Sequence, residues 1–355
     1  MRILMTADAA GGVGVFADEL ARALVARGHQ VLTAVFSPTR PAFTPGLHRL
    51  WAPFRLEWMD RNGEAGEVAA EAQNGRAFLA ALARQWRPEL LHSNHFAYAG
   101  AVGQVPTLLS VHSDVVSWWR HVRGCAPPDN AYQRWYAGLA RDALASAGAV
   151  VTPSQSARQD MRTSFSTPRK VRVIANGRDA AGFACESKQA LALTVGRLWD
   201  AGKQVGVLAR ISEETGMELA MAGELRHPLR AEATAAPRGV RVLGPMGETE
   251  LRQWMARARV YIGTSLYEPF GLAPLEAALS GCALVLNDIG PWRELWEGAA
   301  CFYRTVEELV EWLRRAAAEP EWAAERGQAA RRHARQRYSQ ARMVQAYESA
   351  YRSLL

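Results

Sequence analysis

Two glutamates eight residues apart give the clearest chemical signal in the sequence. The segment Glu268-Pro-Phe-Gly-Leu-Ala-Pro-Leu-Glu276 follows a short apolar run and contains two prolines and a glycine. That composition predicts a rigid loop leading into a helix that begins near Pro274, with Glu268 before the helix and Glu276 one turn inside it. Carboxylates at these places can accept hydrogen bonds from hydroxyls, and the backbone N–H groups around 270–272 can bind the oxygens of a polyol or a phosphate. The spacing matches no metal-binding pattern, and no D-x-D sequence occurs.

A pair of cations follows another apolar run. Gly196 and Arg197 come directly after the predicted strand 190–195, and Lys203 lies six residues beyond Arg197. Residues just past the carboxyl ends of parallel strands face the ligand in open α/β sheets. Arg197 and Lys203 are therefore placed to hold a diphosphate between them. The chain has only three lysines, and one of them stands here.

A glycine-rich stretch opens the chain. Gly11 and Gly12 lie between the predicted strand 2–5 and the predicted helix 14–27. Such a loop can bring the backbone close to a phosphate at the start of a helix, or it can simply form a tight turn. The spacing is not G-x-G-x-x-G, and no acidic residue ends the second strand, 30–36, so a nicotinamide dehydrogenase is disfavoured.

Histidines follow two predicted strands of the first half. His112 ends the strand 107–112 and Asp114 comes two residues later, where a ligand is expected in such sheets. His112 could donate a hydrogen bond to a sugar hydroxyl or orient a reacting group, and a structural histidine is the alternative. For His92 and His95 a structural role is favoured, because no third ligand at a suitable spacing supports a metal site.

Two adjacent tryptophans, Trp118 and Trp119, precede Arg120. Neighbouring residues cannot share one helix face, so at least one of the two rings is expected to be partly exposed. An exposed indole can stack on a sugar ring, and a tryptophan beside an arginine also suits a membrane interface. Packing of both rings in the core is the favoured single interpretation.

Short apolar runs that alternate with helical stretches must position these residues. The pattern predicts an α/β fold with two doubly wound parallel sheets. The expected strands are 2–5, 30–36, 90–92, 107–112, 149–152 and 171–174 in the first half, and 190–195, 218–222, 240–243, 260–263 and 283–286 in the second. Asn176-Gly177 opens a connecting segment, 176–189, and the residues 339–355 form an amphipathic helix.

Composition limits the class of protein. The 355 residues are 49% hydrophobic and 22% charged, as in a folded chain large enough for two domains. The four cysteines lie far apart, so neither a disulfide framework nor a zinc cluster is indicated, and a reducing cytosol is expected. Asp8 interrupts any amino-terminal signal sequence, and polar residues interrupt the charge-free window 90–113, so neither a secretory signal nor a membrane span is expected.

Positive charge is concentrated in the first half. Residues 1–182 carry 20 Lys and Arg against 14 Asp and Glu, whereas residues 183–355 carry 22 against 21. A basic domain beside a nearly neutral one suggests an anionic ligand or an anionic surface, and charge that serves solubility is the alternative.

Together these motifs resemble the retaining glycosyltransferases of family 4, which have the GT-B architecture. The resemblance covers nearly the whole chain in the order of its pieces: Gly11-Gly12, His112, Val151-Thr-Pro-Ser154, Val173-Ile-Ala-Asn-Gly177, Gly196-Arg197 with Lys203, Glu268 to Glu276 as an E-x7-E motif, Gly281 to Leu286, and Glu294. One departure concerns the cations, because many members of the family have the arginine and lysine five residues apart rather than six.

The resemblance implies two Rossmann-like domains that face each other across a cleft. An acceptor-binding domain would span 1–180, with the helix 339–355 packed back onto it, and a nucleotide-sugar-binding domain would span 190–335. Glu276 would bind the donor ribose and Glu268 the hydroxyls of the transferred sugar, with the backbone of Phe270, Gly271, Leu272 and Ala273 supporting sugar and phosphate. Gly196, Arg197 and Lys203 would hold the diphosphate, and Gly11 and Gly12 would close on it.

His112 would then touch the donor hexose, and Asp114, Trp118 and Trp119 would contact the acceptor. His112, Arg197, Lys203 and Glu268 form the implied catalytic set. The implied reaction transfers a hexose from a nucleotide-diphosphate sugar, a UDP-sugar in preference to a GDP-sugar, to an acceptor hydroxyl with retention and without a metal or other cofactor. Closure about 176–189 would exclude water.

The expected partners are that donor and a saccharide, lipid-linked or small-molecule acceptor, with no nucleic acid. A cytoplasmic protein that contacts the inner face of the membrane is the expected setting. A sugar-nucleotide epimerase, a glycogen-type phosphorylase with a pyridoxal-phosphate lysine, and a non-catalytic sugar-nucleotide-binding subunit remain as alternatives.

Overall fold

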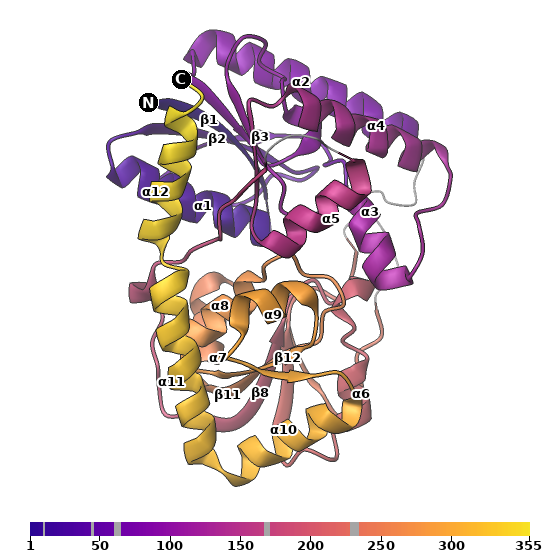
Figure 1. Ribbon diagram of the computed structural model, residues 1–355, viewed down its shortest axis with the longest axis vertical. Helices are drawn as coiled ribbons and strands as arrows, with labels where there is room; N and C mark the ends of the chain where they lie inside the picture. The colour runs from indigo at the N-terminus through magenta and orange to yellow at the C-terminus, as the bar shows by residue number, and fades with distance from the viewer. Residues whose placement is uncertain (10, 44–45, 60–64, 167–170, 228–233) are drawn as a thin grey trace. The chain divides into compact units, whose positions relative to one another are not determined.

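The computed structural model describes residues 1–9, 11–43, 46–59, 65–166, 171–227 and 234–355. These residues form two compact units (Figure 1). The first contains Met1–Gly177 and Gln340–Leu355, and the second contains Arg178–Ser339. The division falls inside the connecting segment expected from the sequence.

Parallel strands form one sheet in each unit, as the sequence predicts. The described part of the first unit holds seven strands in the order β3-β2-β1-β4-β5-β6-β7, and that of the second holds six in the order β10-β9-β8-β11-β12-β13. In the first unit the strands are β1 (Arg2–Asp8), β2 (Gln30–Phe36), β3 (His48–Ala52), β4 (Leu90–Ser93), β5 (Thr107–Ser110), β6 (Ala149–Thr152) and β7 (Val171–Val173). The second has β8 (Gln189–Val195), β9 (Glu218–Ala222), β10 (Arg241–Gly244), β11 (Ala258–Gly263), β12 (Ala283–Asn287) and β13 (Cys301–Tyr303).

Helices connect the strands and cover the sheets. The first unit has α1 (Gly11–Ala26), α2 (Ala65–Trp86), α3 (Val115–Trp118), α4 (Ala131–Ser146), α5 (Gln155–Phe165) and α12 (Gln340–Arg352), with the short helices η1 (Phe96–Tyr98) and η2 (Trp119–Arg123). The second has η3 (Ala180–Gly182), η4 (Ala201–Lys203), α6 (Val207–Ile211), α7 (Glu248–Arg257), α8 (Leu272–Leu279), α9 (Gly290–Trp296), α10 (Val306–Ala318) and α11 (Pro320–Arg337). None of the helices in the described residues is both long and apolar enough to cross a bilayer.

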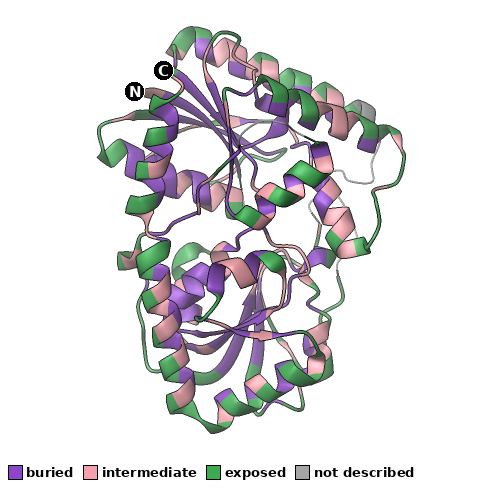
Figure 2. Ribbon diagram, viewed as in Figure 1, coloured by how far each residue is buried: buried purple, intermediate pink, exposed green. Residues whose placement is uncertain are grey.

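Burial on both faces explains the strands that the sequence shows best. Every residue of β2 except Gln30 is buried, since helices pack on both sides of a parallel sheet and each side demands apolar residues. Figure 2 shows this buried band through both sheets. The two strands that sequence analysis missed lack such a run. β3 is an edge strand whose burial alternates with exposure, and β13 has only three residues.

The last helix packs onto the first unit. In α12 the side chains of Val344, Tyr347 and Tyr351 are buried, as the periodicity of the segment predicts. Glu348 accepts hydrogen bonds from Arg27, beyond the end of α1, through Nε and Nη2, both at 2.8 Å. Figure 1 shows α12 lying beside α1 near the amino terminus.

Candidate functional site

Lys203 and Glu268 form an ion pair at the carboxyl edge of the second sheet. Lys203 ends η4, which follows β8, and its ammonium donates to Glu268 in the loop between β11 and α8. The two segments are also tied through the backbone, because Leu266 N–H donates to Gly202 O at 2.8 Å. The side chains are 17% and 21% exposed, so both keep a face open to a ligand. The structure thus pairs the predicted diphosphate cation with the predicted sugar-binding carboxylate.

Gly196 makes room for the lysine stem. A Cβ added at this residue would lie 3.2 Å from Cε of Lys203, which is closer than ordinary packing allows. Arg197, the next residue, is 43% exposed, with its Nη2 3.5 Å from Oδ2 of the buried Asp200. Its guanidinium also lies 5.6 Å from the ring centre of Trp199. The two predicted cations therefore follow the same strand, β8, and each has a carboxylate beside it.

The start of α8 presents backbone donors at the same edge. Gly271 precedes the helix with φ of 87°, and an added Cβ would lie 2.9 Å from Pro274. No side chain of the described residues caps this end, so the N–H groups of Leu272 and Ala273 can donate to an anion. Phe270 is buried, with its ring 5.4 Å from that of Tyr338, and can serve a ligand only through its backbone. The helix begins two residues before the predicted start at Pro274.

A buried arginine that the sequence does not predict lies beside Glu276. Arg178 is 3% exposed, and its Nε lies 3.1 Å from Oε1 of Glu276 in α8. Arg178 also forms an ion pair with Glu248 at the start of α7, and hydrogen bonds to Arg178 and Arg252 help to hold the pKa of Glu248 below its usual value against the effect of burial. The sequence shows only an arginine after an Asn-Gly turn, with nothing that links it to residues so distant in the chain.

In the first unit, His112 follows β5 and lies partly buried. Its Nε2 is 2.8 Å from Oδ1 of Asn94, and its ring packs edge-on against Phe16 with 4.5 Å between the ring centres. Burial lowers the pKa of His112 to about 4; the charge of Asp8 opposes that effect and the charge of His95 adds to it. His112 is therefore neutral at pH 7, and its Nε2 is already engaged by Asn94.

His92 and His95, for which the sequence favours a structural role, are both buried. His92 bonds through Nδ1 to the Tyr351 hydroxyl at 2.7 Å and through Nε2 to Ser110 at 2.8 Å, and burial lowers its pKa to about 3. His95 lies 2.5 Å from Asp8. Burial opposes protonation of His95, but the hydrogen bond and the charge of Asp8 prevail and raise its pKa.

Gly11 and Gly12 do not form the predicted loop. Both are exposed and belong to the first turn of α1, which begins three residues before the expected start at Gly14. β1 likewise continues to Asp8 rather than ending at Met5, so the turn between strand and helix is much shorter than predicted. Ala9 is described there, and residue 10 lies outside the described part of the chain.

Asp114, Trp118 and Trp119 lie at α3 and η2. Asp114 is buried and caps α3 by accepting from Ser117 N–H at 2.7 Å, and burial raises its pKa to about 6. The two indoles meet edge to face at 5.8 Å between ring centres, and both are partly exposed. Trp119 packs against the core of the first unit, whereas Arg123 lies over Trp118 at 5.7 Å. The ring of Trp119 thus belongs to the edge of that core, whereas the ring of Trp118 pairs with a guanidinium.

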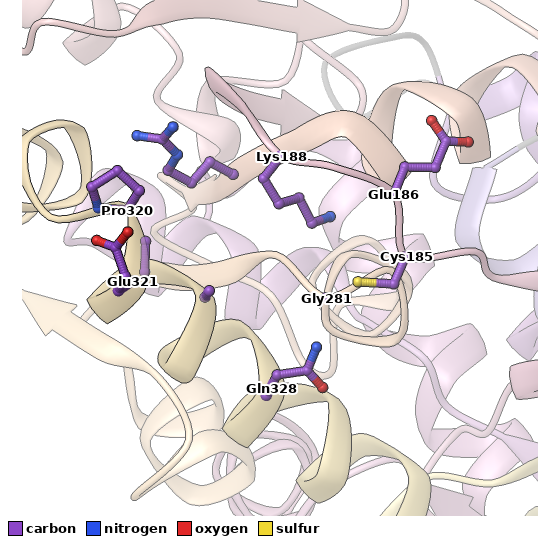
Figure 3. Close-up of a pocket in the computed structure, with 10 residues that line it drawn as sticks. Cys185, Glu186, Lys188, Gly281, Pro320, Glu321 and Gln328 are labelled. Carbon is purple, nitrogen blue, oxygen red and sulfur yellow. The ribbon is translucent and has the colours of Figure 1, made fainter.

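A pocket of about 380 Å³ lies at the opposite edge of the second sheet (Figure 3). Its lining includes Lys188, Arg259 and Gly281, which stand at or before the amino ends of β8, β11 and β12. The Lys188 ammonium donates to the carbonyls of residues 255, 256 and 280, and Arg259 donates to those of residues 316 and 317. Both cations therefore bind backbone carbonyls, whereas Lys203 at the carboxyl edge is paired with a carboxylate.

Comparison with known proteins identifies both halves of the chain. The family model "Glycosyltransferase Family 4" matches residues 10–181, and "Glycosyl transferases group 1" matches residues 189–318. The chain is 28% identical to glycogen synthase from Mycobacterium tuberculosis over 93% of this chain and 89% of that protein. It is 24% identical to D-inositol 3-phosphate glycosyltransferase from Jonesia denitrificans over 79% of this chain and 76% of that one.

Solved structures agree in fold. Sucrose-phosphate synthase from Thermosynechococcus elongatus superposes with a TM-score of 0.81 at 18% identity, covering 100% of this chain and 99% of that one. HepE from Anabaena in complex with UDP-glucose superposes with a TM-score of 0.76 at 18% identity, covering 100% of both chains. The expected two-sheet GT-B fold is confirmed. Taken together, the fold and the two family models show that this chain is a glycosyltransferase of the GT-B type.

Proposed function

We propose that the protein transfers a hexose from a nucleotide-diphosphate sugar to an acceptor hydroxyl with retention at the anomeric carbon and without a metal. The observation that carries the proposal is the group of residues at the carboxyl edge of the second sheet. Two cations follow β8, Glu268 is paired with one of them, and α8, which contains Glu276, starts without a side-chain cap in the described residues. The cations suit a diphosphate, Glu268 suits the hydroxyls of a hexose, and Glu276 suits those of a ribose.

The reaction places negative charge on the leaving diphosphate. Arg197, Lys203 and the N–H groups at the start of α8 can stabilise that charge, so most of the lowering of the barrier is electrostatic. The departing phosphate can itself accept the proton of the acceptor hydroxyl, so the mechanism needs no separate general base. Because the solved relative HepE is described with UDP-glucose, we favour a UDP-sugar as donor.

The test is a binding and turnover panel with UDP-, GDP-, ADP- and dTDP-hexoses. A ligand present at 100 times its Kd stabilises the folded state by about 2.7 kcal/mol, which a thermal shift detects. We expect the largest shift with a UDP-sugar and release of UDP that EDTA does not reduce. NMR of the product should show the anomeric configuration of the donor. An inverted product would contradict the retaining mechanism, and release of UDP that EDTA abolishes would contradict a metal-independent one.

The same panel separates the alternatives. An epimerase would change the hexose without releasing nucleotide, and a binding subunit would show a thermal shift without turnover. A phosphorylase would absorb light as a pyridoxal-phosphate protein and would need inorganic phosphate. Release of nucleoside diphosphate together with a new glycosidic bond supports the transferase alone.

We also propose an anionic or membrane-borne acceptor, because η2 carries Arg120, His121 and Arg123 beside Trp118. A cationic segment with an indole can bind an anionic surface. Sedimentation with vesicles of phosphatidylcholine and phosphatidylserine should pull the protein down at low salt and release it at high salt. Sedimentation that depends on neither the anionic lipid nor salt would contradict this proposal without affecting the choice of donor.

A further inference from the structure

The contacts of Asn94 determine which way its side-chain amide faces. Its Nδ2 donates to the Thr6 carbonyl at 2.6 Å, and its backbone N–H donates to Thr6 Oγ1 at 2.9 Å. A carbonyl oxygen can only accept, so the amide nitrogen must face Thr6. The amide oxygen, Oδ1, then faces Nε2 of His112 at 2.8 Å. Because an amide oxygen carries no proton, the proton in this hydrogen bond belongs to Nε2 of His112.

With the proton on Nε2, the other ring nitrogen of His112, Nδ1, is unprotonated. A neutral imidazole carries one proton, so Nδ1 of His112 is an acceptor when Nε2 is the donor. Among the described residues, Nδ1 of His112 has no hydrogen-bond partner, and Phe16 packs against the ring. The low pKa of His112, about 4, agrees with a neutral ring at physiological pH.

The groups around Asn94 hold it firmly in place. Thr6, Asn94, His95 and Asp8 are all at least nine-tenths buried and come from the ends of β1 and β4. Thr6 Oγ1 also lies 2.9 Å from Nδ1 of His95, which in turn pairs with Asp8. The amide of Asn94 therefore cannot rotate without losing its hydrogen bonds to Thr6 and His112, and a buried polar group is costly to leave unpaired.

We propose that Asn94 is a positioning residue that keeps the proton of His112 on Nε2, so that Nδ1 accepts a hydrogen bond from a hydroxyl group of the sugar substrate. This inference rests on the proposed function and adds a specificity rule to it. The substrate group that meets His112 must be a hydrogen-bond donor. It also reverses the sequence-based expectation that His112 donates to a sugar hydroxyl, because its one proton is committed to Asn94.

The first test needs no substitution in the protein that is measured. Long-range ¹H–¹⁵N NMR of the full chain with ¹⁵N-labelled histidine distinguishes protonated from bare ring nitrogens, and loss of one signal set in His112→Asn assigns it. We expect a protonated Nε2 and a bare Nδ1 at pH 7, with titration near pH 4. A protonated Nδ1, or a doubly protonated ring at pH 7, would overturn the inference.

The second test uses the substitution Asn94→Asp. A carboxylate accepts from Nε2 as the amide does, but its charge favours the imidazolium and raises the pKa of His112 toward neutrality. The groups that face His112 are Asp8 on β1 and the histidines of β4 and its following loop, His92 and His95, with the uncharged Phe16 on α1. Asp8 and His95 are paired with each other, so the new carboxylate is the main change in charge.

The expected readout is the pH profile of kcat/KM with the donor identified by the panel. In Asn94→Asp the rate should fall about tenfold per pH unit below the raised pKa of His112, because an imidazolium Nδ1 cannot accept. The wild type should show no such loss between pH 8 and 6. The matched control is Asn130→Asp, which keeps the cap of α4 and should leave the profile unchanged. A purely structural role of Asn94 would lower the rate equally at every pH, and that result would overturn the inference.

The two proposals can fail separately. A protonated Nδ1 in a protein that turns over a nucleotide sugar overturns the role of Asn94 and leaves the transferase intact. A bare Nδ1 in a protein that neither binds nor converts any nucleotide sugar overturns the proposed function, and the contact between His112 and the sugar falls with it.

Discussion

At the scale of single residues, the two cations after β8 have different surroundings. Lys203 is mostly buried and touches Glu268, whereas Arg197 is 43% exposed and lies further from its carboxylate. The Arg197 guanidinium is 43% exposed and lies 3.5 Å from its carboxylate, so the pair contributes little to stability and replacing Arg197 should affect chemistry more than folding. Lys203 and Glu268 hold each other in place before a donor arrives, and this pairing is a form of preorganisation.

The prediction for Arg197→Met is a loss of about 10²–10³ in kcat/KM for the donor, or about 2.7–4 kcal/mol, by analogy with removal of one oxyanion donor. The midpoint of urea unfolding should move less than the kinetics, since the Arg197 side chain is 43% exposed and its ion pair is long. Arg241→Met is the matched control, because Arg241 also lies over a tryptophan, at 5.1 Å, and pairs with an exposed glutamate at 3.0 Å. Equal kinetic effects of the two substitutions would remove Arg197 from the diphosphate site.

At the scale of helices and strands, Arg178 joins two helices of the second unit. It lies between Glu248 of α7 and Glu276 of α8, and its backbone N–H donates to Tyr338 O at 3.0 Å, just beyond α11. A buried guanidinium between two carboxylates keeps Glu276 in one orientation. Removal of one member of such a group leaves a buried charge uncompensated.

A double-substitution experiment tests this arrangement. Arg178→Met should destabilise the chain by about 3–5 kcal/mol, because the buried Glu276 loses its partner. Adding Glu276→Gln should recover part of that free energy, since the uncharged amide no longer needs the cation, and yet donor binding should stay weak. Stability is measured by urea unfolding and donor affinity by calorimetry. Recovery of both stability and affinity in the double variant would show that Glu276 does not bind the donor.

The last helix is held to the first unit by a charged contact as well as by its apolar face. Glu348 accepts from Arg27 and, at 2.9 Å, from His29. The hydrogen bond from Arg27, with a smaller contribution from His29, lowers the pKa of Glu348 to about 2. A carboxylate whose pKa is lowered on folding contributes stability above its unfolded pKa, near 4.5, and loses that contribution as pH falls toward 2.

We therefore predict that Glu348→Gln destabilises the chain by about 1–3 kcal/mol at pH 7 and that the difference from wild type shrinks steadily below pH 4.5. Glu297→Gln is the control, because its carboxylate is 72% exposed and lies 3.9 Å from Arg293. Urea unfolding at pH 7, 4 and 3 measures the effect. A difference that persists unchanged to pH 3 would contradict the role of the ion pair.

At the scale of the whole molecule, each unit has its own hydrophobic core, and two described histidines whose pKa values are strongly lowered by burial lie in the first unit. His92 and His112 have folded pKa values of about 3 and about 4, both below the ordinary value of 6.5. At pH values between these folded pKa values and 6.5, the two histidines are protonated in the unfolded chain but neutral in the folded unit. Stability contributed by neutral histidines is therefore complete above pH 6.5 and decreases as pH falls toward 4.

For the wild type we predict a loss from these two residues of up to about 2.7 kcal/mol per pH unit between pH 6 and 4. His112→Asn should lose only about half as much per pH unit, since one proton-binding group is absent from its unfolded state. Urea unfolding followed by circular dichroism across this pH range gives both slopes. Identical slopes would show that His112 is protonated as easily in the folded protein as in the unfolded one.

The sequence alone predicts the sheets and the chemistry of the second unit. Strands covered by helices on both faces need continuous apolar runs, so β2, β6 and β9 were predicted with the ends that the structure shows. The loop and helix around Glu268 and Glu276 also follow from local signals, because proline and glycine act on the backbone next to them. Short strands and edge strands such as β3 lack such a signal, since half of their side chains face solvent.

Only the tertiary structure reveals the partners of these residues. The pairs Arg178–Glu276 and Lys203–Glu268, and the contacts that join Asn94 to Thr6 and His112, link residues far apart in the chain. Local propensity and periodicity describe what a residue does to its own backbone, whereas ion pairs and histidine tautomers depend on atoms that folding brings together. The sequence therefore determines that a cation, a carboxylate and a histidine stand at the ends of strands, and packing decides which of them meet and which nitrogen holds the proton.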